Sequence, residues 1–366
     1  MCDGCCRMAD LIAVEDLADV PRDVTRGNEK RRKMVTRKEV AKEAGVSPAT
    51  VSHVINNTKY VSPELRKRVE EAIRRLDYRP NMVARSLATK TTKHVGILVN
   101  DITNPYYGEI AQGMEEVARH YGYMVSLCVA SGDSEKYFAN ILQRQMDGLF
   151  IATVEHGFSS SQLEKLKKSG IAIVNGMDKE KASIIDFDYA ETIDETVKYL
   201  KDMGHIRIGF LSGLSINHPG HMRYQAYVSA VKKYGTCLDP NLIIDGEFPF
   251  HTTSQSGYIA MKKLLARTHA TAVIASNDLM AFGAMRAIRE AGFRIPEDIS
   301  VVGCDDIFLA ECMEPPLTTI RAPKKQMGRE AMHMILKQLK DGETEEIFLK
   351  TELIIRGSTG MAPSAR

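Results

Sequence analysis

The sequence has no apolar run near the roughly 20 residues that a membrane-spanning helix needs. Its first twenty residues are acidic and lack the basic start and long apolar centre of a secretory signal. These two absences disfavour a membrane protein and an exported one. The composition, with 44% hydrophobic and 26% charged residues, is that of an ordinary globular protein, and a cytoplasmic location is predicted.

Cysteine is also too sparse for a disulfide framework. Four single cysteines in apolar or helical surroundings are predicted to be buried free thiols: Cys128, Cys237, Cys304 and Cys312. Cys2, Cys5 and Cys6 cluster at the start, but no other Cys or His lies at short metal-ligand spacing from them. A disordered tail is therefore favoured over a zinc site, and no metal site is predicted.

Common catalytic motifs are absent as well. The chain has no Walker-type glycine loop, no G-x-G-x-x-G, no H-E-x-x-H and no G-x-S-x-G. Asp305 and Asp306 form a possible carboxylate pair, but a ligand contact beside a helix cap explains both. The prediction is a protein that is not an enzyme and needs no cofactor.

Charge is nearly balanced over the whole chain, at +2, but it is unevenly spread. Residues 34–93 carry 13 Lys and Arg against 6 Asp and Glu, whereas residues 94–366 have a net charge of −5. A basic segment attached to an acidic body is typical of nucleic-acid binding, although a solvated basic face is the simpler alternative.

The basic segment contains the pattern of a helix-turn-helix. An apolar stripe of Val40, Ala41 and Ala44 predicts a short helix that ends at Gly45. Ser47 and Pro48 then form the start signal of a second helix, which buries Val51, Val54 and Ile55. Residues 48–50 and His53 face outward, so this second helix is expected to enter the major groove of DNA by its N-terminal end.

Two further segments follow. Ser62 and Pro63 start a third helix, whose stripe of Leu65, Val69, Ala72, Ile73 and Leu76 closes a three-helix core. Residues 81–88 can form a helix too short to persist alone in water, which predicts ordering only on DNA or against a second subunit. Leu87 in this hinge is expected to wedge into the minor groove, and a plain linker is the alternative.

The run from VTRKEVAKEAGVSPATVSHVI to RPNMVARSLATK resembles the DNA-binding head and hinge of the lactose/galactose repressor family of bacterial transcriptional regulators. The resemblance continues to LIIRGST at 353–359, while residues 1–33 have no counterpart. With the helix pattern it predicts a set of DNA-contacting residues. They are Thr36, Ser47, Pro48, Ala49, Thr50, His53, Asn56, Lys59, Tyr60, Arg85 and Leu87.

Beyond residue 94 strands and helices alternate. Short runs rich in Val and Ile predict buried parallel strands at 94–100, 123–129, 147–153, 171–175, 182–188, 206–213, 242–248, 271–276 and 299–306. The fold class expected is thus a small all-α head plus a two-lobed α/β sensor domain, similar to type I periplasmic binding proteins. Ligands of such sheets bind beyond the carboxyl ends of the strands, here in a cleft between lobes.

Polar and aromatic residues at these strand ends are the candidate effector site: Asp101, Tyr106, Tyr107, Arg223, Phe248, Asn277 and Asp305. The family resemblance implies that Tyr106 and Tyr107 are its aromatic pair, Arg223 its ligand arginine and Asp305 its ligand aspartate. It implies stacking on the ligand for Phe248 in some members only. Cys304, where an aromatic residue is common, and INHPGHM at 216–222 depart from the pattern, so effector identity stays open.

The predicted organisation is an extension at 1–33, a helix-turn-helix domain at 34–79, a hinge at 80–93 and an effector-binding and dimerisation domain at 94–366. Lobe 1 is expected at about 94–189 and 321–342, and lobe 2 at about 190–320 and 343–358. The predicted function is a homodimeric repressor of a pseudo-palindromic operator, controlled by a sugar or sugar phosphate more than by a purine. A sugar-binding protein without a DNA role is the alternative.

Overall fold

The computed structural model describes residues 35–79, 86, 89, 91–129, 134–152, 158–175, 182–217, 221–246 and 252–364. The chain divides into two compact units, Met1–Ala88 and Thr89–Arg366. The boundary between them falls inside the segment predicted to be a hinge. Among the described residues no helix has both the length and the apolar character needed to span a bilayer.

The first unit contains helices α1 (Arg37–Ala44), α2 (Pro48–Asn56) and α3 (Pro63–Arg75). Each begins at a side-chain cap, Thr36, Ser47 or Ser62, and the caps at Ser47 and Ser62 are those that the start signals predict. Gly45 ends α1 with a left-handed backbone, φ 62°, which glycine adopts without steric strain. The core consists of Val40, Ala41, Ala44, Val51, Val54, Val69, Ala72 and Tyr78, with Ile55, Ile73 and Leu76 half-buried around it.

The second unit contains two sheets. The first has the order β2-β1-β3-β4 and is parallel: β1 (His94–Val99), β2 (Met124–Val129), β3 (Gly148–Ile151) and β4 (Ala172–Val174). The second has the order β12-β10-β9-β8-β6-β7: β6 (Ile208–Leu211), β7 (Ile243–Ile244), β8 (Ala272–Ala275), β9 (Ser300–Asp305), β10 (Thr318–Arg321) and β12 (Glu352–Ile354). Within it only the β10–β12 pair is antiparallel.

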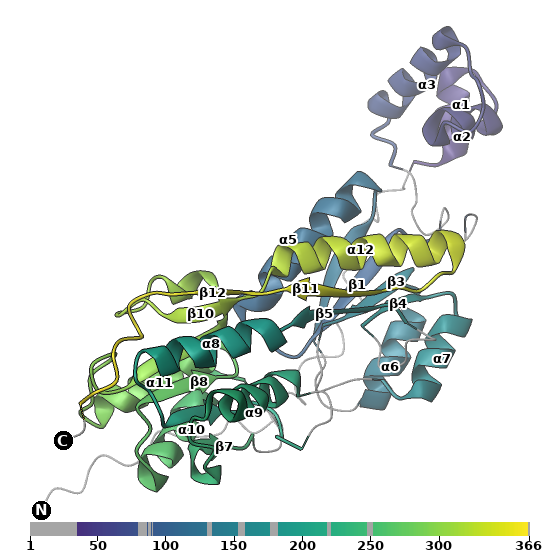
Figure 1. Cartoon of the computed structure of the whole chain (residues 1–366). Helices are drawn as coiled ribbons and strands as arrows, with labels where there is room; N and C mark the ends of the chain where they lie inside the picture. The colour runs from purple at the N-terminus through teal and green to yellow at the C-terminus, as the bar shows by residue number, and fades with distance from the viewer. Residues whose placement is uncertain are drawn as a thin grey trace, which may run out of the picture. The chain divides into compact units, whose positions relative to one another are not determined.

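Helices cover both faces of each sheet, as Figure 1 shows. On the first sheet, α5 (Pro105–His120) and α12 (Lys324–Asp341) lie side by side on one face, with α6 (Ser134–Gln143) and α7 (Ser160–Lys168) on the other. On the second, α8 (Ala190–Asp202) and α9 (Met222–Tyr234) pack together, and so do α10 (Ser254–Arg267) and α11 (Asp278–Glu290). This layering buries the central parallel strands of both sheets, as such sheets require.

A short third sheet joins the lobes. The segment 182–188 does form a strand, β5 (Ile184–Asp188), but it pairs in parallel with β11 (Glu346–Lys350) instead of extending the first sheet. Only an isolated bridge, Val174 to Ser183, connects it to that sheet. Ile185, Phe187 and Leu349 make one continuous core from the α5–α12 face of lobe 1 to the α8–α9 face of lobe 2.

Two expectations about burial are wrong. β2 is an edge strand, so Met124 and Leu127 are exposed although the run was predicted to be buried. The four cysteines are free, but only Cys304 is buried; Cys128 and Cys237 are half-buried and Cys312 is exposed. Cys312 lies in the turn that follows the short 3-10 helix Phe308–Ala310.

Candidate functional site

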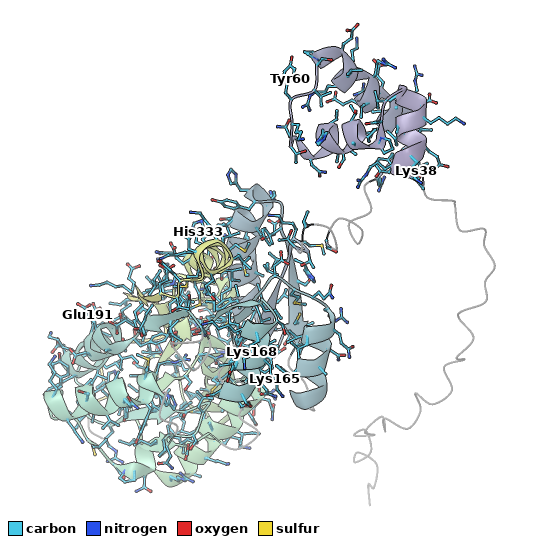
Figure 2. The ribbon with its side chains drawn as sticks, turned by 90° about the vertical axis from the view of Figure 1, so that its right-hand side faces the viewer. Lys38, Tyr60, Lys165, Lys168, Glu191 and His333 are labelled. Carbon is cyan, nitrogen blue, oxygen red and sulfur yellow. The ribbon has the colours of Figure 1, made fainter. Side chains whose placement is uncertain are left out.

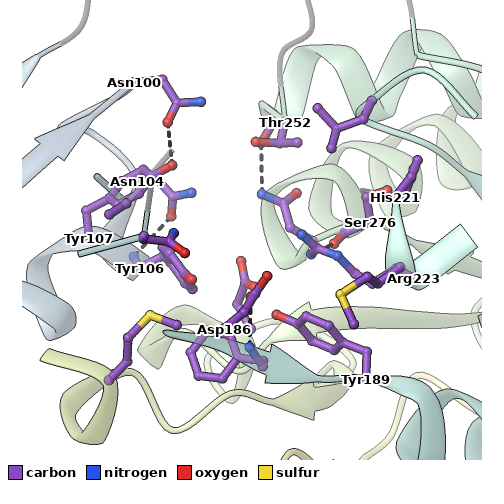
Figure 3. Close-up of a pocket in the computed structure, with 18 of the residues that line it drawn as sticks. Asn100, Asn104, Tyr106, Tyr107, Asp186, Tyr189, His221, Arg223, Thr252 and Ser276 are labelled. Carbon is purple, nitrogen blue, oxygen red and sulfur yellow. Dashed lines mark hydrogen bonds between the residues drawn. The ribbon is translucent and has the colours of Figure 1, made fainter. Parts of the chain in front are cut away.

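A cavity of about 140 Å³ lies in the second unit, where the carboxyl ends of strands from both sheets meet. Side chains from both lobes converge on it, as the close-up in Figure 3 shows. Its lining consists of Asn100, Asn104, Tyr106, Tyr107, Phe150, Ala152, Asn175, Asp186, Phe187, Tyr189, Leu214, His221, Met222, Arg223, Thr252, Ser276, Asn277, Asp305 and Met327. Of the seven predicted effector residues, five are therefore brought together here: Tyr106, Tyr107, Arg223, Asn277 and Asp305.

Arg223, in the first turn of α9, is the cation of the pocket. Its Nη1 donates to the carbonyl of Ser276, 2.5 Å away, and approaches the thiol of Cys304 at 3.8 Å. The guanidinium carbon lies 4.9 Å from the ring centre of Tyr189, a cation–π distance. These three contacts fix the plane of the guanidinium while leaving donors for a ligand.

Asp305, the last residue of β9, is 5% exposed. No described residue donates a hydrogen bond to its carboxylate. Burial raises the pKa of Asp305, against the opposing charges of Arg223 and Lys324. Its φ of 114° lies in a region that non-glycine residues rarely adopt and that often marks functional sites. A buried acceptor without a donor is costly, so the geometry suits a ligand that supplies hydrogen-bond donors.

The opposite wall is aromatic and amidic. Tyr106 and Tyr107 begin α5 and meet edge to face with their ring centres 5.1 Å apart, and Tyr107 donates to Asn100 Oδ1. Asn104 caps the helix through Oδ1, 3.0 Å from the amide of Tyr106, and its side chain is buried. Its Nδ2 has no acceptor among the described residues, which leaves a second polar atom for a ligand.

Several residues that line the cavity were not predicted from the sequence. Asp186 lies within the apolar run 182–188, so its carboxylate was read as part of a buried strand. Burial raises the pKa of Asp186. Tyr189 follows the same strand, and His221 caps α9 while bonding Ser212 Oγ at 2.7 Å. The signal available for His221 was its place in the segment 216–222 that departs from the family pattern.

Other predicted residues lie elsewhere. The Asp101 carboxylate does not line the cavity; it accepts from the backbone and hydroxyl of Thr103 in a turn. Asp306, read as a helix cap, instead pairs with Arg356 and Arg321, each at 2.7 Å. Asp278, next to the predicted Asn277, is buried and accepts hydrogen bonds from the Thr319 hydroxyl and the amide of Ile307. Phe248 lies outside the described residues.

The first unit presents the start of α2 as the predicted DNA-reading edge. Ser47 caps α2 through Oγ, 3.1 Å from the amide of Thr50. Pro48 and Ala49 are exposed beside it, and Thr50 and His53 are half-buried. His53 Nδ1 lies 2.9 Å from Thr58 Oγ1, so the turn that follows α2 orients the ring.

The turn between α2 and α3 carries further candidates. Asn56, Lys59 and Tyr60 are exposed, and Tyr60 projects from this turn with 89% of its surface accessible (Figure 2). Arg66 Nη2 donates to Asn57 Oδ1 at 2.9 Å and so braces the turn. Thr36 is exposed, but its hydroxyl and amide are held by Glu39 in a capping box. Arg85 and Leu87 lie outside the described residues.

Within the parts of the chain that the structure describes, no group of three or more His, Cys, Asp and Glu side chains is placed to hold a metal ion. Two family models match the sequence. "Bacterial regulatory proteins, lacI family" matches residues 36–81, and "Periplasmic binding protein-like domain" matches residues 197–359. The two matches fall in different compact units.

Relatives extend over nearly the whole chain. The HTH-type transcriptional repressor PurR of Pasteurella multocida (strain Pm70) is 36% identical over 333 residues, covering 89% of this chain and 98% of the relative. The HTH-type transcriptional repressor CytR of Escherichia coli (strain K12) is 34% identical over 341 residues, covering 91% and 99%.

Solved structures agree with this. The lac repressor dimer bound to operator and the anti-inducer ONPF matches with a TM-score of 0.76 and 27% identity, over 90% of this chain and 100% of that one. The complex of the transcriptional regulator CelR with cellobiose matches with a TM-score of 0.66 and 30% identity, over 88% and 99%.

Proposed function

From the premise that this chain belongs to the lacI family of bacterial regulatory proteins and is a DNA-binding transcriptional regulator, we propose that it is a repressor whose operator affinity is set by a small molecule in the cavity of its second unit. The relatives are transcriptional repressors, a class that is not enzymatic. Acting on chromosomal DNA, it works in the cytoplasm.

The observation that carries this proposal is the buried carboxylate of Asp305 facing a cavity that also holds Arg223. Both side chains line this cavity, and the described residues leave the carboxylate without a donor. Preorganised polar groups on an otherwise aromatic wall are the usual form of a small-molecule site. Asn277, which bonds the carbonyl of Thr252 at 3.0 Å, and the Tyr106–Tyr107 pair complete the candidate effector set.

The charge of the lining favours a neutral effector. Among the lining residues Arg223 is the one Lys or Arg, and two acidic groups, Asp186 and Asp305, lie in the same cavity, so a phosphate dianion would have a single guanidinium to pair with. Adjacent hydroxyls of a sugar donate naturally to Asp305 and accept from Arg223 and Asn104. An unphosphorylated sugar or nucleoside is therefore the first candidate, in keeping with neighbours solved with cellobiose and with ribose. A purine base, stacking on the aromatic wall, is the second.

We infer a homodimer that reads a pseudo-palindromic operator, because a two-fold protein reads a two-fold site. Residues 34–79 act as the reading head, residues 80–93 as the hinge and residues 94–366 as the effector-binding and dimerising part. Lobe 1 takes in about 94–189 and 321–342, and lobe 2 takes in about 190–320 and 343–358. Pro48 to Thr50 and His53 face bases, and Thr36, Asn56, Lys59 and Tyr60 face the backbone of the DNA.

The test uses the full chain and an operator fragment selected from random duplex DNA. Thermal-shift measurements with ribose, cellobiose, adenosine, hypoxanthine and ribose 5-phosphate identify the effector class, since a ligand raises the unfolding temperature by mass action. Gel-shift titrations with and without the hit then measure the change in operator affinity. Failure to select any DNA would support a sugar-binding protein without a DNA role, and a shift with ribose 5-phosphate alone would contradict a neutral effector.

A further inference from the structure

Lys324 stands in a place that is unfavourable for a lysine. It is the first residue of α12, where the positive end of the helix dipole repels a cation. It is also 3% exposed, although a buried ammonium group is costly unless it is paired. The neighbouring Lys325 is exposed, so burial belongs to this one position. Strong contacts are needed to offset both the repulsion by the helix dipole and the desolvation of the ammonium group.

Those contacts join the two lobes. Lys324 Nζ donates to the carbonyl of Asp305 and, at 2.9 Å, to the carbonyl of Asp306, both at the end of β9 in lobe 2. The same ammonium lies 3.5 Å from Glu109 Oε1 on α5 in lobe 1. It therefore bridges the residue that faces the effector cavity and the helix whose first turn supplies Tyr106 and Tyr107.

The lobe 1 end of this bridge is rigid. The backbones of α5 and α12 touch where glycines remove the side chains: a Cβ at Gly113 would lie 2.0 Å from the carbonyl oxygen of Lys325. A Cβ at Gly328 would lie 2.0 Å from the carbonyl oxygen of Ile110. Because the backbones of the two helices are in close contact here, they are expected to move together. A displacement at the end of β9 is therefore transmitted to α5 through Lys324.

We propose that Lys324 is a positioning residue that holds the left-handed backbone of Asp305 and, through Glu109, transmits occupancy of the cavity from β9 to helix α5. The inference rests on the proposed function in one respect, that an effector in the cavity changes operator affinity. Its structural half, the mechanical link between Glu109 and the end of β9, is independent of any ligand.

The first test needs no effector. Hydrogen exchange is followed by mass spectrometry on the full chain for the wild type, Glu109→Gln and Lys324→Met. Each variant is expected to speed exchange at least threefold in peptides covering 305–308, where the amide of Ile307 donates to Asp278. Glu116→Gln is the matched control, since it also removes an α5–α12 ion pair, with Arg329 at 3.1 Å, but one away from β9. A role confined to packing α5 would move exchange within α5 only.

The second test measures coupling with the compound of the above panel that gives the largest thermal shift. Effector Kd is measured by calorimetry, and operator affinity with and without that compound by gel shift. Glu109→Gln, which lies outside the cavity lining, should keep the Kd within about threefold and reduce the operator response to less than twofold. Lys325→Met is the control for Lys324→Met, because it makes the same substitution one residue further along α12. It should give the same effector Kd and the same operator response as the wild type.

Unchanged exchange at 305–308 in Glu109→Gln would overturn the link, even if Lys324→Met fails to fold. A wild-type response in Glu109→Gln would overturn its role in transmission while leaving the regulator itself intact. A wild type that binds the compound but shows no change in operator affinity would instead contradict the proposed function and the transmission together.

Discussion

At the scale of single residues, Asp305 combines three costs that are seldom found together. It has a left-handed φ, it is buried, and its carboxylate accepts no hydrogen bond from the described residues. Backbone strain and desolvation of this kind persist where the surrounding structure enforces them, most often at ligand-binding and active sites. The sequence pointed to this residue by its position at the end of a strand, but its backbone strain and unmet acceptor are visible only in three dimensions.

Asp305→Asn is therefore expected to weaken effector binding about 10- to 100-fold, because an amide has half the acceptor capacity and no charge to meet the donors of the ligand. Operator affinity without effector should stay within about twofold, since Asp305 lies in the other compact unit. Calorimetry with the sugar found by the thermal-shift panel and gel shift measure the two quantities. An equal loss of effector affinity and operator affinity would show that Asp305 supports the folded structure and not ligand binding in particular.

Asp278 gives a pH-dependent prediction. Burial raises the pKa of Asp278 well above its ordinary value, and the nearby Asp305 raises it further. In the unfolded chain this carboxyl ionises near pH 4, whereas in the folded chain it keeps its proton to higher pH. Its contribution to stability is thus present below the unfolded pKa and is lost as pH rises through the folded pKa.

Asp278→Asn removes this titration. The unfolding free energy of the wild type minus that of the variant should fall as pH rises from about 4 toward 7. Taking the difference cancels surface carboxylates such as Asp194, whose pKa is lowered and which act in the opposite sense. Urea unfolding of the full chain at three pH values is the measurement. A difference that grows with pH would show that Asp278 is ionised in the folded protein.

At the scale of elements, the sequence predicted the secondary structure of each segment better than the partner with which that segment pairs. Periodicity located all four strands of the first sheet and β6 to β9 of the second, but not β10 and β12. An apolar stripe located α1, and start signals located α2 and α3. The sequence could not assign β5, because a parallel strand carries no mark of its partner and β11 lies some 160 residues away along the chain. For the same reason Asp186 was missed: within an apolar run, nothing local shows that its side chain opens into a cavity.

The crossing of α5 and α12 gives a test within one helix. Gly113→Ala should destabilise the second unit by about 2 kcal/mol or more, because the added methyl collides with the carbonyl of Lys325 and the helices must separate. Gly108→Ala is the matched control in the same helix, with no atom within 4 Å of the new Cβ. It should stabilise the unit by about 0.5–1 kcal/mol through helix propensity alone. Urea unfolding of both variants tests the pair, and equal effects would contradict a tight crossing.

Helix α2 and the turn after it give a second pair of variants. His53→Ala should cost about 1–3 kcal/mol on the selected operator and relax specificity at one base pair. Lys59→Ala should weaken binding to selected and to random DNA alike. It should also reduce the slope of log binding constant against log salt concentration by about one. Gel-shift titrations on both DNAs at several salt concentrations distinguish them. If His53→Ala weakens random DNA equally, α2 is not the reading helix.

At the scale of the whole molecule, reading and sensing lie in separate compact units, so regulation requires a link that neither unit contains alone. An effector that changes operator affinity 5- to 150-fold needs a coupling free energy of only about 1–3 kcal/mol. Operator DNA must then change effector affinity by the same factor. This reciprocity makes the coupling measurable from either end and independent of the path that carries it.

Leu87, in the predicted hinge and outside the described residues, tests that path from the DNA end. The hinge helix predicted at 81–88 would be too short to persist alone in water, so we expect pairing with a second subunit and the opened minor groove to stabilise it. Unstacking a base step costs a few kcal/mol, which a large inserted apolar side chain can offset and a methyl group cannot. Leu87→Ala should therefore abolish most DNA bending in a circular-permutation assay and much specific affinity, while calorimetry shows unchanged effector binding. Normal bending by this variant would make residues 80–93 a plain linker, and the signal from the cavity would then have to reach the reading head by another route.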